Sequence, residues 1–349
     1  MTTTNQTGPK GRPRRVETTS QLLPILLLLA AASKSDGGAH SDRVGYLMGT
    51  VCEISSNGND ASTTAAFNEI ARVESSLSTW RPDSELSKLN RSLPGQPVTV
   101  SDELFEVLSR TMAWSARTKG AFNPLVGRLI EVWALRGAGA VPDGETLVAA
   151  RDSAQLDQVA LDPSTHTIRR LSDARFEEGA FGKGYALDRA TALLRARGVS
   201  RASINFGGQI ALFGSGSSIV EIASPLVRTQ PLVRLRIPEG SLSTSGGSEK
   251  TFTVKGRTFI HIVDPRTGQA LPPRGSVSVF STRAFDADVL STALFVLGPG
   301  EGMEWADTNG VAALFLTPRP DGSIELRASK TLRMLTAIEP LSRKIKLED

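Results

Sequence analysis

Residues 177–190 read EEGAFGKGYALDRA, in which a turn of small residues leads into the start of an amphipathic helix. The apolar positions of that helix recur at helical spacing, and we predict that it extends over 182–198. From residue 157 onward, short β-rich runs punctuated by Gly and Pro surround it, and a second helix is predicted among them over 286–297. The sequence therefore predicts an α+β fold in which helices cover the sheets.

The N-terminal half adds further elements to this pattern. A strand is predicted over 44–55, and the turn after it predicts a helix that is capped by Asp60. The apolar side of that helix is predicted to consist of Ala65, Ile70, Val73 and Leu77. Another helix is predicted over 101–118, with Ser101 as its cap. Residues 318–349 are charged and weakly patterned, which predicts a peripheral tail.

The N-terminal residues have the order of a secretory signal: basic KGRPRR at 10–15, then the apolar run LLPILLLLAAA, which ends in small alanines. The run is shorter than the ~20 apolar residues that a membrane-spanning helix needs. We therefore predict a signal peptide over 1–32, a linker over 33–43 and one domain over 44–317. A short anchor or a buried N-terminal helix is the alternative, and both general and twin-arginine export stay open.

The chain of 349 residues has 40 Lys+Arg against 36 Asp+Glu, a formal net charge of +4. Most of that excess lies within the predicted signal peptide, so the composition does not indicate nucleic-acid binding. The single cysteine, Cys52, cannot form an intramolecular disulfide and is expected to be a small core residue.

The turn that opens the helix at 182 is one candidate site. Backbone N–H groups at a helix start, together with the helix dipole, favour an anion. The segment is not a P-loop, because Lys183 is followed by Gly184 rather than by Ser or Thr. The alternative is an ordinary tight turn with a solvated lysine.

A second candidate is the stretch TFIHIVDPRTGQAL, which begins at residue 258. Its alternation predicts Phe259, His261 and Val263 on one face of a strand, before a turn set by a proline and closed by a glycine. Asp264 and Thr267 would then meet at the strand end, where ligands are often held. The alternative is a histidine with a purely structural role.

The third candidate lies in the predicted helix over 286–297. Asp288 and Thr292 are four residues apart, so they share one face of that helix. A carboxylate and a hydroxyl are hard oxygen donors, which suit Mg²⁺ better than zinc or copper. The alternative is an acid near a helix start and a threonine bonded to its own turn.

Taken in order, these segments resemble the ApbE family, the FAD:protein FMN transferases. The resemblance spans about 46–298 and rests on MGT, STWRPDSELSKLN, GAFNPLVG, EGAFGKGYALD, NFGG, STSG, HIVDPRTG and DADVLSTALFVLG. It implies a layered α/β sandwich with mixed sheets. Members of the family work outside the cytoplasm, often as lipoproteins, and the lipobox cysteine is missing here. The leader suits this family, and we expect an exported protein, periplasmic or on the outer face of the cytoplasmic membrane, that is not lipid-anchored through a lipobox cysteine.

The resemblance also implies site residues. The FAD-contacting positions are Met48, Trp80, Ala121, Phe122, Asn123, Glu177, Lys183 and His261. The ligands of Mg²⁺ would be Asp288, Thr292 and the backbone carbonyl of Ala180. The chain departs from the family at three of these positions, with Glu177 and Asn123 where Asp is usual or common and Trp80 where Tyr is common.

The implied activity is Mg²⁺-dependent transfer of FMN from FAD to a Thr or Ser hydroxyl of an exported acceptor protein, with release of AMP. The catalytic residues would be Asp288 as metal ligand, Lys183 as positive charge and either His261 or Asp286 as proton acceptor. Two alternatives stay open, an FAD pyrophosphatase that gives FMN and AMP, and an exported FAD-binding protein without turnover. Membrane contact is expected only through an uncleaved N-terminal segment.

Overall fold

The computed structural model describes residues 40–247 and 251–348. The predicted signal peptide and most of the predicted linker lie outside these residues. None of the helices in these two ranges is both long enough and apolar enough to cross a membrane.

The largest sheet among the described residues has ten strands and is mixed. Neighbouring strands in it are β1 (Ser41–Leu47), β2 (Thr50–Ser56), β6 (Ala202–Phe206), β7 (Gln209–Ala223), β8 (Pro231–Gly246), β11 (Ser276–Ser281), β12 (Ala312–Pro318), β13 (Ile324–Ala328) and β15 (Ile345–Leu347), and β14 (Ile338–Pro340) pairs with β8. The pairs are antiparallel apart from β13 and β15, which run parallel.

Helices and two small sheets complete the fold. The helices are α1 (Asp60–Leu77), α2 (Glu85–Asn90), α3 (Asp102–Arg117), α4 (Gly127–Val132), α5 (Gly144–Ser153), α6 (Gly182–Ala196), α7 (Ala284–Thr308) and α8 (Lys330–Leu335). The small sheets are β3 (Pro97–Thr99) with β5 (Thr167–Arg170) and β4 (Val159–Asp162), and β9 (Thr251–Val254) with β10 (Arg257–Ile260). The predicted α+β class is confirmed, as are the predicted helices that became α3, α6 and the first part of α7.

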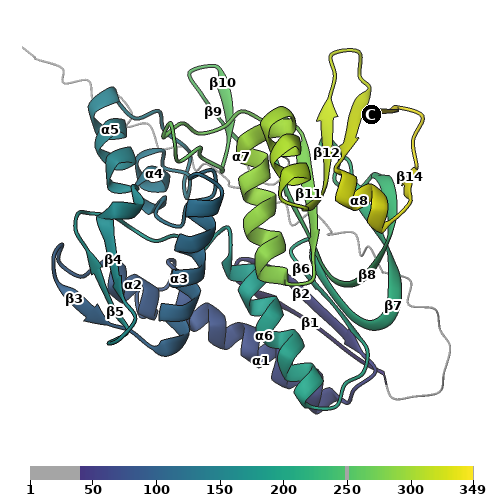
Figure 1. Ribbon diagram of the computed structural model, residues 1–349, viewed down its shortest axis with the longest axis horizontal. Helices are drawn as coiled ribbons and strands as arrows, with labels where there is room; N and C mark the ends of the chain where they lie inside the picture. The colour runs from purple at the N-terminus through teal and green to yellow at the C-terminus, as the bar shows by residue number, and fades with distance from the viewer. Residues whose placement is uncertain (1–39, 248–250, 349) are drawn as a thin grey trace, which may run out of the picture.

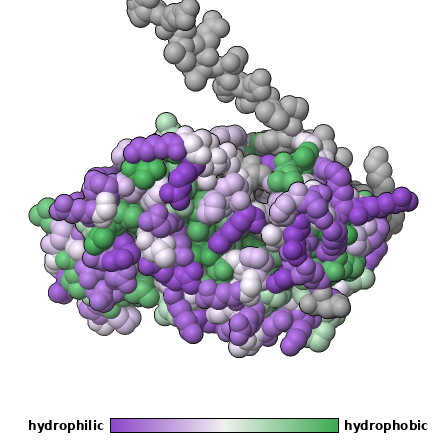
Figure 2. Space-filling view, turned by 90° about the horizontal axis from the view of Figure 1, so that it is seen from above, coloured by the Kyte–Doolittle hydropathy of each residue, from purple (hydrophilic) through white to green (hydrophobic). Residues whose placement is uncertain are grey.

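Helix α7 runs between the two parts of the molecule. Figure 1 shows the large sheet on one side of it and helices α2 to α5 with the small β3–β5–β4 sheet on the other. Helix α6 packs against α1 and α7, and α7 packs against β8 and β11. On the face seen in Figure 2, hydrophobic side chains appear in small groups among hydrophilic ones. Because α6 packs against α7 and α7 packs against β8, the start of α6 and one face of α7 meet where the helical part adjoins the large sheet.

The predicted strand over 44–55 is wrong in one respect: it is a hairpin. β1 and β2 are antiparallel neighbours joined at Met48 and Gly49, both of which have positive φ (45° and 75°). This is the geometry of a tight two-residue hairpin turn, in which the first position is more often Asn, Asp or Gly. A methionine there gives no turn signal, so the apolar pattern reads as one strand.

The cap of α1 is Asn59 rather than the predicted Asp60. The Asn59 side chain accepts a hydrogen bond from the backbone N–H of Ser62, and Asp60 is the first helical residue. Asn and Asp are comparable caps, so the sequence NGND does not decide between neighbouring positions. On the buried side of α1, Ala66 replaces the predicted Ala65, whereas Ile70, Val73 and Leu77 are buried as predicted.

The predicted peripheral tail over 318–349 is also corrected by the structure. Strand β13 pairs with β12 inside the large sheet, and β14 pairs with β8. The buried apolar side chains of this segment are Ile324, Leu326, Ala328 and Leu332. The many charged residues of this segment suggested a solvated tail. In the structure they pair with one another, for example Arg327 with Glu348 at 2.6 Å.

Candidate active site

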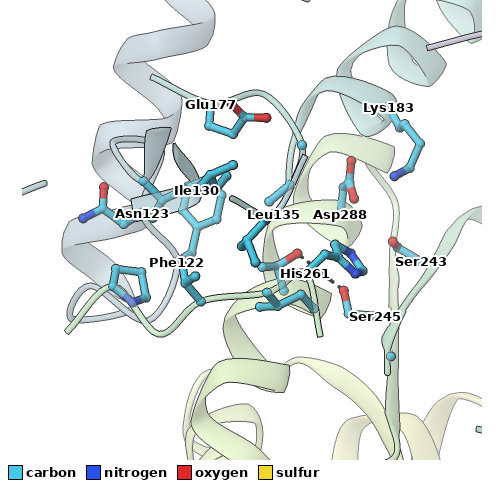
Figure 3. A pocket seen from close by; sticks show the side chains of 18 of the residues that line it. Phe122, Asn123, Ile130, Leu135, Glu177, Lys183, Ser243, Ser245, His261 and Asp288 are labelled. Atoms are coloured by element: carbon cyan, nitrogen blue, oxygen red, sulfur yellow. Dashed lines mark hydrogen bonds between the residues drawn. The ribbon is translucent and has the colours of Figure 1, made fainter. Parts of the chain in front are cut away.

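A cavity of about 410 Å³ lies where the start of α6, the inner face of α7 and the end of β8 come together. Figure 3 shows side chains from these elements around it. The predicted site residues that line it are Trp80, Ala121, Phe122, Asn123, Glu177, Ala180, Lys183, His261, Asp288 and Thr292. The volume falls in the range usual for small-molecule sites. Residues separated by more than 200 positions in the sequence thus share one cavity.

Met48 is the predicted site residue that does not line this cavity. It sits in the β1–β2 turn, where its backbone N–H donates to Glu74 Oε1 at 3.0 Å. Its methyl group lies beside Gly182, 3.0 Å from where a Cβ on that glycine would be. Met48 therefore supports the turn before α6 from behind.

The position of Asp288 is fixed by α6. The backbone N–H of Gly184 donates to Asp288 Oδ2 at 2.9 Å, and the Asp288 side chain is buried. A side chain on Gly184 would collide with the carbonyl oxygen of Ala284 in α7. Glycine at 184 is therefore what lets the two helices approach closely enough for this hydrogen bond.

The start of α7 is also held by α6. Its own cap residue, Arg283, makes no side-chain cap hydrogen bond. Instead Asp188 accepts from the backbone N–H groups of Ala284 (2.7 Å) and Phe285 (3.2 Å). Sequence reasoning quoted Asp188 only as part of a motif and missed this role, because a cap supplied by another helix leaves no local signal.

Hydroxyl groups join α7 to β8 beside Asp288. Ser291 lies within 3.2 Å of Ser243 Oγ and 3.0 Å of Ser245 Oγ, and it also donates to the carbonyl of Asp288. Ser245 Oγ lies 3.4 Å from Thr292 Oγ1. Ser243 and Ser245 belong to the STSG motif, which forms the end of strand β8.

His261 reaches the cavity from just beyond a strand. Strand β10 ends at Ile260, so the predicted single strand face with Phe259, His261 and Val263 does not exist. In Figure 3 the His261 ring points toward the part of the cavity where Asp288 and Ser245 lie. The turn that follows it is closed as predicted, with the Gly268 N–H donating to the carbonyl of Asp264.

Asp264 and Thr267 do not form the predicted ligand-holding strand end. Neither lines the cavity. The Asp264 carboxylate is instead bound by Arg266, through the backbone N–H at 2.9 Å and the guanidinium at 3.0 Å. This pair stabilises the turn itself.

Asp286 is excluded as the proton acceptor at this cavity. Its Oδ1 accepts from Trp114 Nε1 at 2.9 Å and lies 3.7 Å from the guanidinium of Arg110. Residues two positions apart point to different sides of a helix. Asp286 therefore faces α3, whereas Asp288 lines the cavity. Of the two predicted candidates, His261 is the one that lines the cavity.

The Asn123 side chain holds part of the cavity wall in place by hydrogen bonds to backbone groups of other residues. Its Nδ2 donates to the carbonyl of Ala154 at 2.7 Å, and its Oδ1 accepts from the N–H of Leu125 at 2.8 Å. Ala121 and Phe122 beside it are buried. The segment is therefore a fixed wall rather than a mobile loop.

A carboxylate network borders the opposite side of the cavity. Glu177 Oε2 accepts from Arg136 and from Thr79 Oγ1, and Glu178 accepts from the backbone N–H of Thr79 at 3.0 Å. Burial, and next the charge of Glu178, raises the pKa of Glu177 to about 7, against the opposing effect of Arg136. Sequence reasoning missed Arg136 and Glu178, since neither occupies a position marked by spacing.

This raised pKa predicts a pH-dependent stability. At pH values between 4.5, the ordinary pKa of a glutamate, and about 7, Glu177 keeps its proton in the folded protein. In the unfolded chain it has lost that proton. The free energy of unfolding therefore falls as pH rises through that window, by roughly 1–3 kcal/mol from this group.

Urea unfolding at pH 5 and pH 7.5 measures this effect, with Glu177→Gln as the comparison, because the amide does not titrate. Between pH 5 and pH 7.5, we expect the free energy of unfolding to decrease less in the variant than in the unmodified chain. Equal decreases in both proteins would contradict the assignment to Glu177.

The described residues contain no cluster of three or more His, Cys, Asp or Glu side chains that could hold a metal. The oxygens of Asp288, Thr292 and Ala180 nevertheless line one cavity. One carboxylate with neutral oxygens is a donor set that suits Mg²⁺, which commonly retains several waters.

Comparisons with known proteins show which family and which relatives the chain is similar to in sequence. A family model described as the ApbE family matches residues 48–315. Two FAD:protein FMN transferases, from Klebsiella pneumoniae (strain 342) and Treponema pallidum (strain Nichols), are 31% and 32% identical to the chain. The alignments cover 75% and 79% of this chain and 84% of each relative.

Solved structures agree with the sequence comparisons. The ApbE protein of Thermotoga maritima has a TM-score of 0.77 and 25% identity, covering 85% of this chain and 99% of its own. The flavin transferase ApbE of Vibrio cholerae has a TM-score of 0.73, with the same identity and coverages. The layered architecture predicted from the resemblance is therefore confirmed.

Proposed function

The chain belongs to the ApbE family and is a transferase enzyme, and from this premise we propose that it moves FMN from FAD to a hydroxyl of an acceptor protein. The acceptor is an exported protein with a Thr or Ser at the modified position, and AMP is released. The single observation that carries the proposal is one cavity that joins Lys183, His261, Asp288 and Thr292.

We infer that Asp288, Thr292 and the carbonyl of Ala180 hold Mg²⁺. Their hard oxygens, their common cavity and the fixed position of Asp288 support this inference. When bound, the ion would stabilise negative charge on the pyrophosphate of FAD.

The protein's own contribution at the pyrophosphate comes from the start of α6. Lys183 lines the cavity in the first turn of that helix, where the helix dipole is positive. A fixed positive potential there favours the charge that develops on phosphate oxygens during transfer. Lys183 thus binds and orients the pyrophosphate.

In the transfer, the acceptor hydroxyl oxygen forms a bond to the FMN phosphorus. The bond between that phosphorus and the bridging oxygen breaks, and AMP leaves with the electron pair. The hydroxyl proton must go to a base, and we assign this role to His261 because it lines the cavity and Asp286 does not.

For localisation we propose export, to the periplasm or the outer face of the cytoplasmic membrane. This proposal rests on the order of basic, apolar and small residues in the N-terminal sequence. We propose that any membrane contact is made through an uncleaved N-terminal segment.

The proposal is tested by incubating the full chain with FAD, Mg²⁺ and a candidate exported flavoprotein, followed by flavin fluorescence of the acceptor on a denaturing gel. We expect a fluorescent acceptor band that disappears when the accepting Thr is changed to Ala. AMP without a fluorescent band for any acceptor would favour the pyrophosphatase, and bound FAD without AMP would favour the binding protein.

A further inference from the structure

Arg136 joins separate segments at the rim of the cavity. It stands in the loop after α4, and its side chain lines the cavity. Its guanidinium contacts Trp80 and Thr79 from the loop after α1, and Glu177 from the turn before α6. Trp80 and Glu177 are both predicted FAD-contacting positions, so one arginine connects two of them.

The contact between Arg136 and Trp80 is a cation–π contact. The guanidinium carbon lies 4.6 Å from the centroid of the indole ring, inside the ~6 Å within which such contacts attract. Trp80 is 63% exposed, so little protein surface packs around its ring. The contact with Arg136 therefore restrains an indole ring that is otherwise largely exposed.

The edge of the same guanidinium fixes Arg136 in turn. It donates to the carbonyl oxygen of Thr79 at 3.2 Å, to Thr79 Oγ1 and to Glu177 Oε2. The Glu177 side chain is only 10% exposed, and at pH values above its raised pKa the buried carboxylate is costly unless it is paired. A planar guanidinium can stack with its face while its edge donates, which a lysine ammonium cannot do.

We propose that Arg136 is a positioning residue for the FAD donor. It holds the Trp80 indole at the rim of the cavity so that a planar heteroaromatic ring of the dinucleotide stacks against it. This inference rests on the proposed function, because it takes FAD as the ligand. FAD carries two such rings, the flavin and the adenine, and probes that contain one ring each distinguish them.

The test uses the full chain with Arg136→Met, which keeps an unbranched apolar stem and removes the planar guanidinium, and with it both charge and stacking. We expect KM for FAD to rise about tenfold, with kcat changed less than about threefold. Binding of FMN and of ADP is measured in parallel, and the probe that loses affinity identifies the stacked ring. Unchanged affinity for both probes, with unchanged KM for FAD, would overturn the inference.

A matched control separates this effect from general loss of an arginine. Arg128 in α4 has similar exposure to Arg136 and pairs with Asp173 at 3.1 Å, away from the cavity lining. We expect Arg128→Met to leave KM for FAD unchanged. An equal rise in KM in both variants would overturn the inference.

A double-mutant cycle tests whether Arg136 acts through Trp80. If it does, adding Arg136→Met to a Trp80→Leu chain raises KM for FAD far less than in the unmodified chain. Full additivity would contradict the mechanism, and so would complete rescue by Arg136→Lys, which restores charge without a planar face. Absence of FAD binding by the unmodified chain would instead count against the proposed function.

Discussion

Replacing Asp288 with asparagine is expected to reduce FMN transfer by at least about a thousandfold while the protein stays folded. The amide still offers an oxygen to the Gly184 N–H, so the contact between α6 and α7 is retained. What the variant loses is the negative charge that, in the proposed mechanism, holds Mg²⁺ at the pyrophosphate. A change of charge at constant shape thus isolates the proposed metal ligand.

Initial rates of acceptor flavinylation measure this prediction, with circular dichroism to check folding. The matched control is Asp286→Asn on the same helix, two residues away and outside the cavity lining. That variant keeps an acceptor for Trp114 Nε1 and should transfer FMN at a near-normal rate. Full activity of Asp288→Asn, or equal losses in both variants, would refute the metal assignment.

The second large effect is expected at Gly184. A Cβ there would lie 2.4 Å from the carbonyl oxygen of Ala284 and 2.8 Å from Asp288 Cβ. The first of these atoms is helix backbone, which cannot rotate away, so Gly184→Ala must push α7 from α6. We expect a loss of about 3 kcal/mol in the free energy of unfolding, together with loss of transfer.

Urea unfolding of Gly184→Ala measures the stability part of this prediction. Gly182→Ala in the same turn is the comparison, since its Cβ would meet the flexible end of Met48 at 3.0 Å. That variant should be destabilised much less, because the methionine side chain can move. Similar stabilities for the two variants would show that the helices do not approach as closely as described.

Elements with strong periodicity could be predicted from the sequence. Helix α3 has Ser101 as its cap and an apolar side that includes Leu104 and Leu108, as the pattern indicates. Helix α7 begins two residues before the prediction and contains a non-helical Gly298 where the predicted helix ended. Local sequence is sufficient here because caps and apolar faces act within a few residues.

Contacts between distant segments could not be predicted in this way. The bonds from Asp188 to the start of α7, and from Arg136 to Glu177, join residues 96 and 41 positions apart. Likewise, nothing in the spacing of Asp286 and Asp288 tells which carboxylate faces a cavity, since that depends on where α3 packs. An ordered set of sequence motifs identified most of the residues that line the site. Their distances and orientations are set by the fold and could be read only from the structure.

The most direct test of Mg²⁺-dependent FMN transfer is a stoichiometry. In one reaction of the full chain with FAD and an acceptor protein, the AMP released and the FMN bound covalently to the acceptor are both quantified, with Mg²⁺ and with EDTA. We predict equal amounts of the two products in Mg²⁺ and neither product in EDTA. AMP release without acceptor-bound FMN, or transfer that persists in EDTA, would contradict this mechanism.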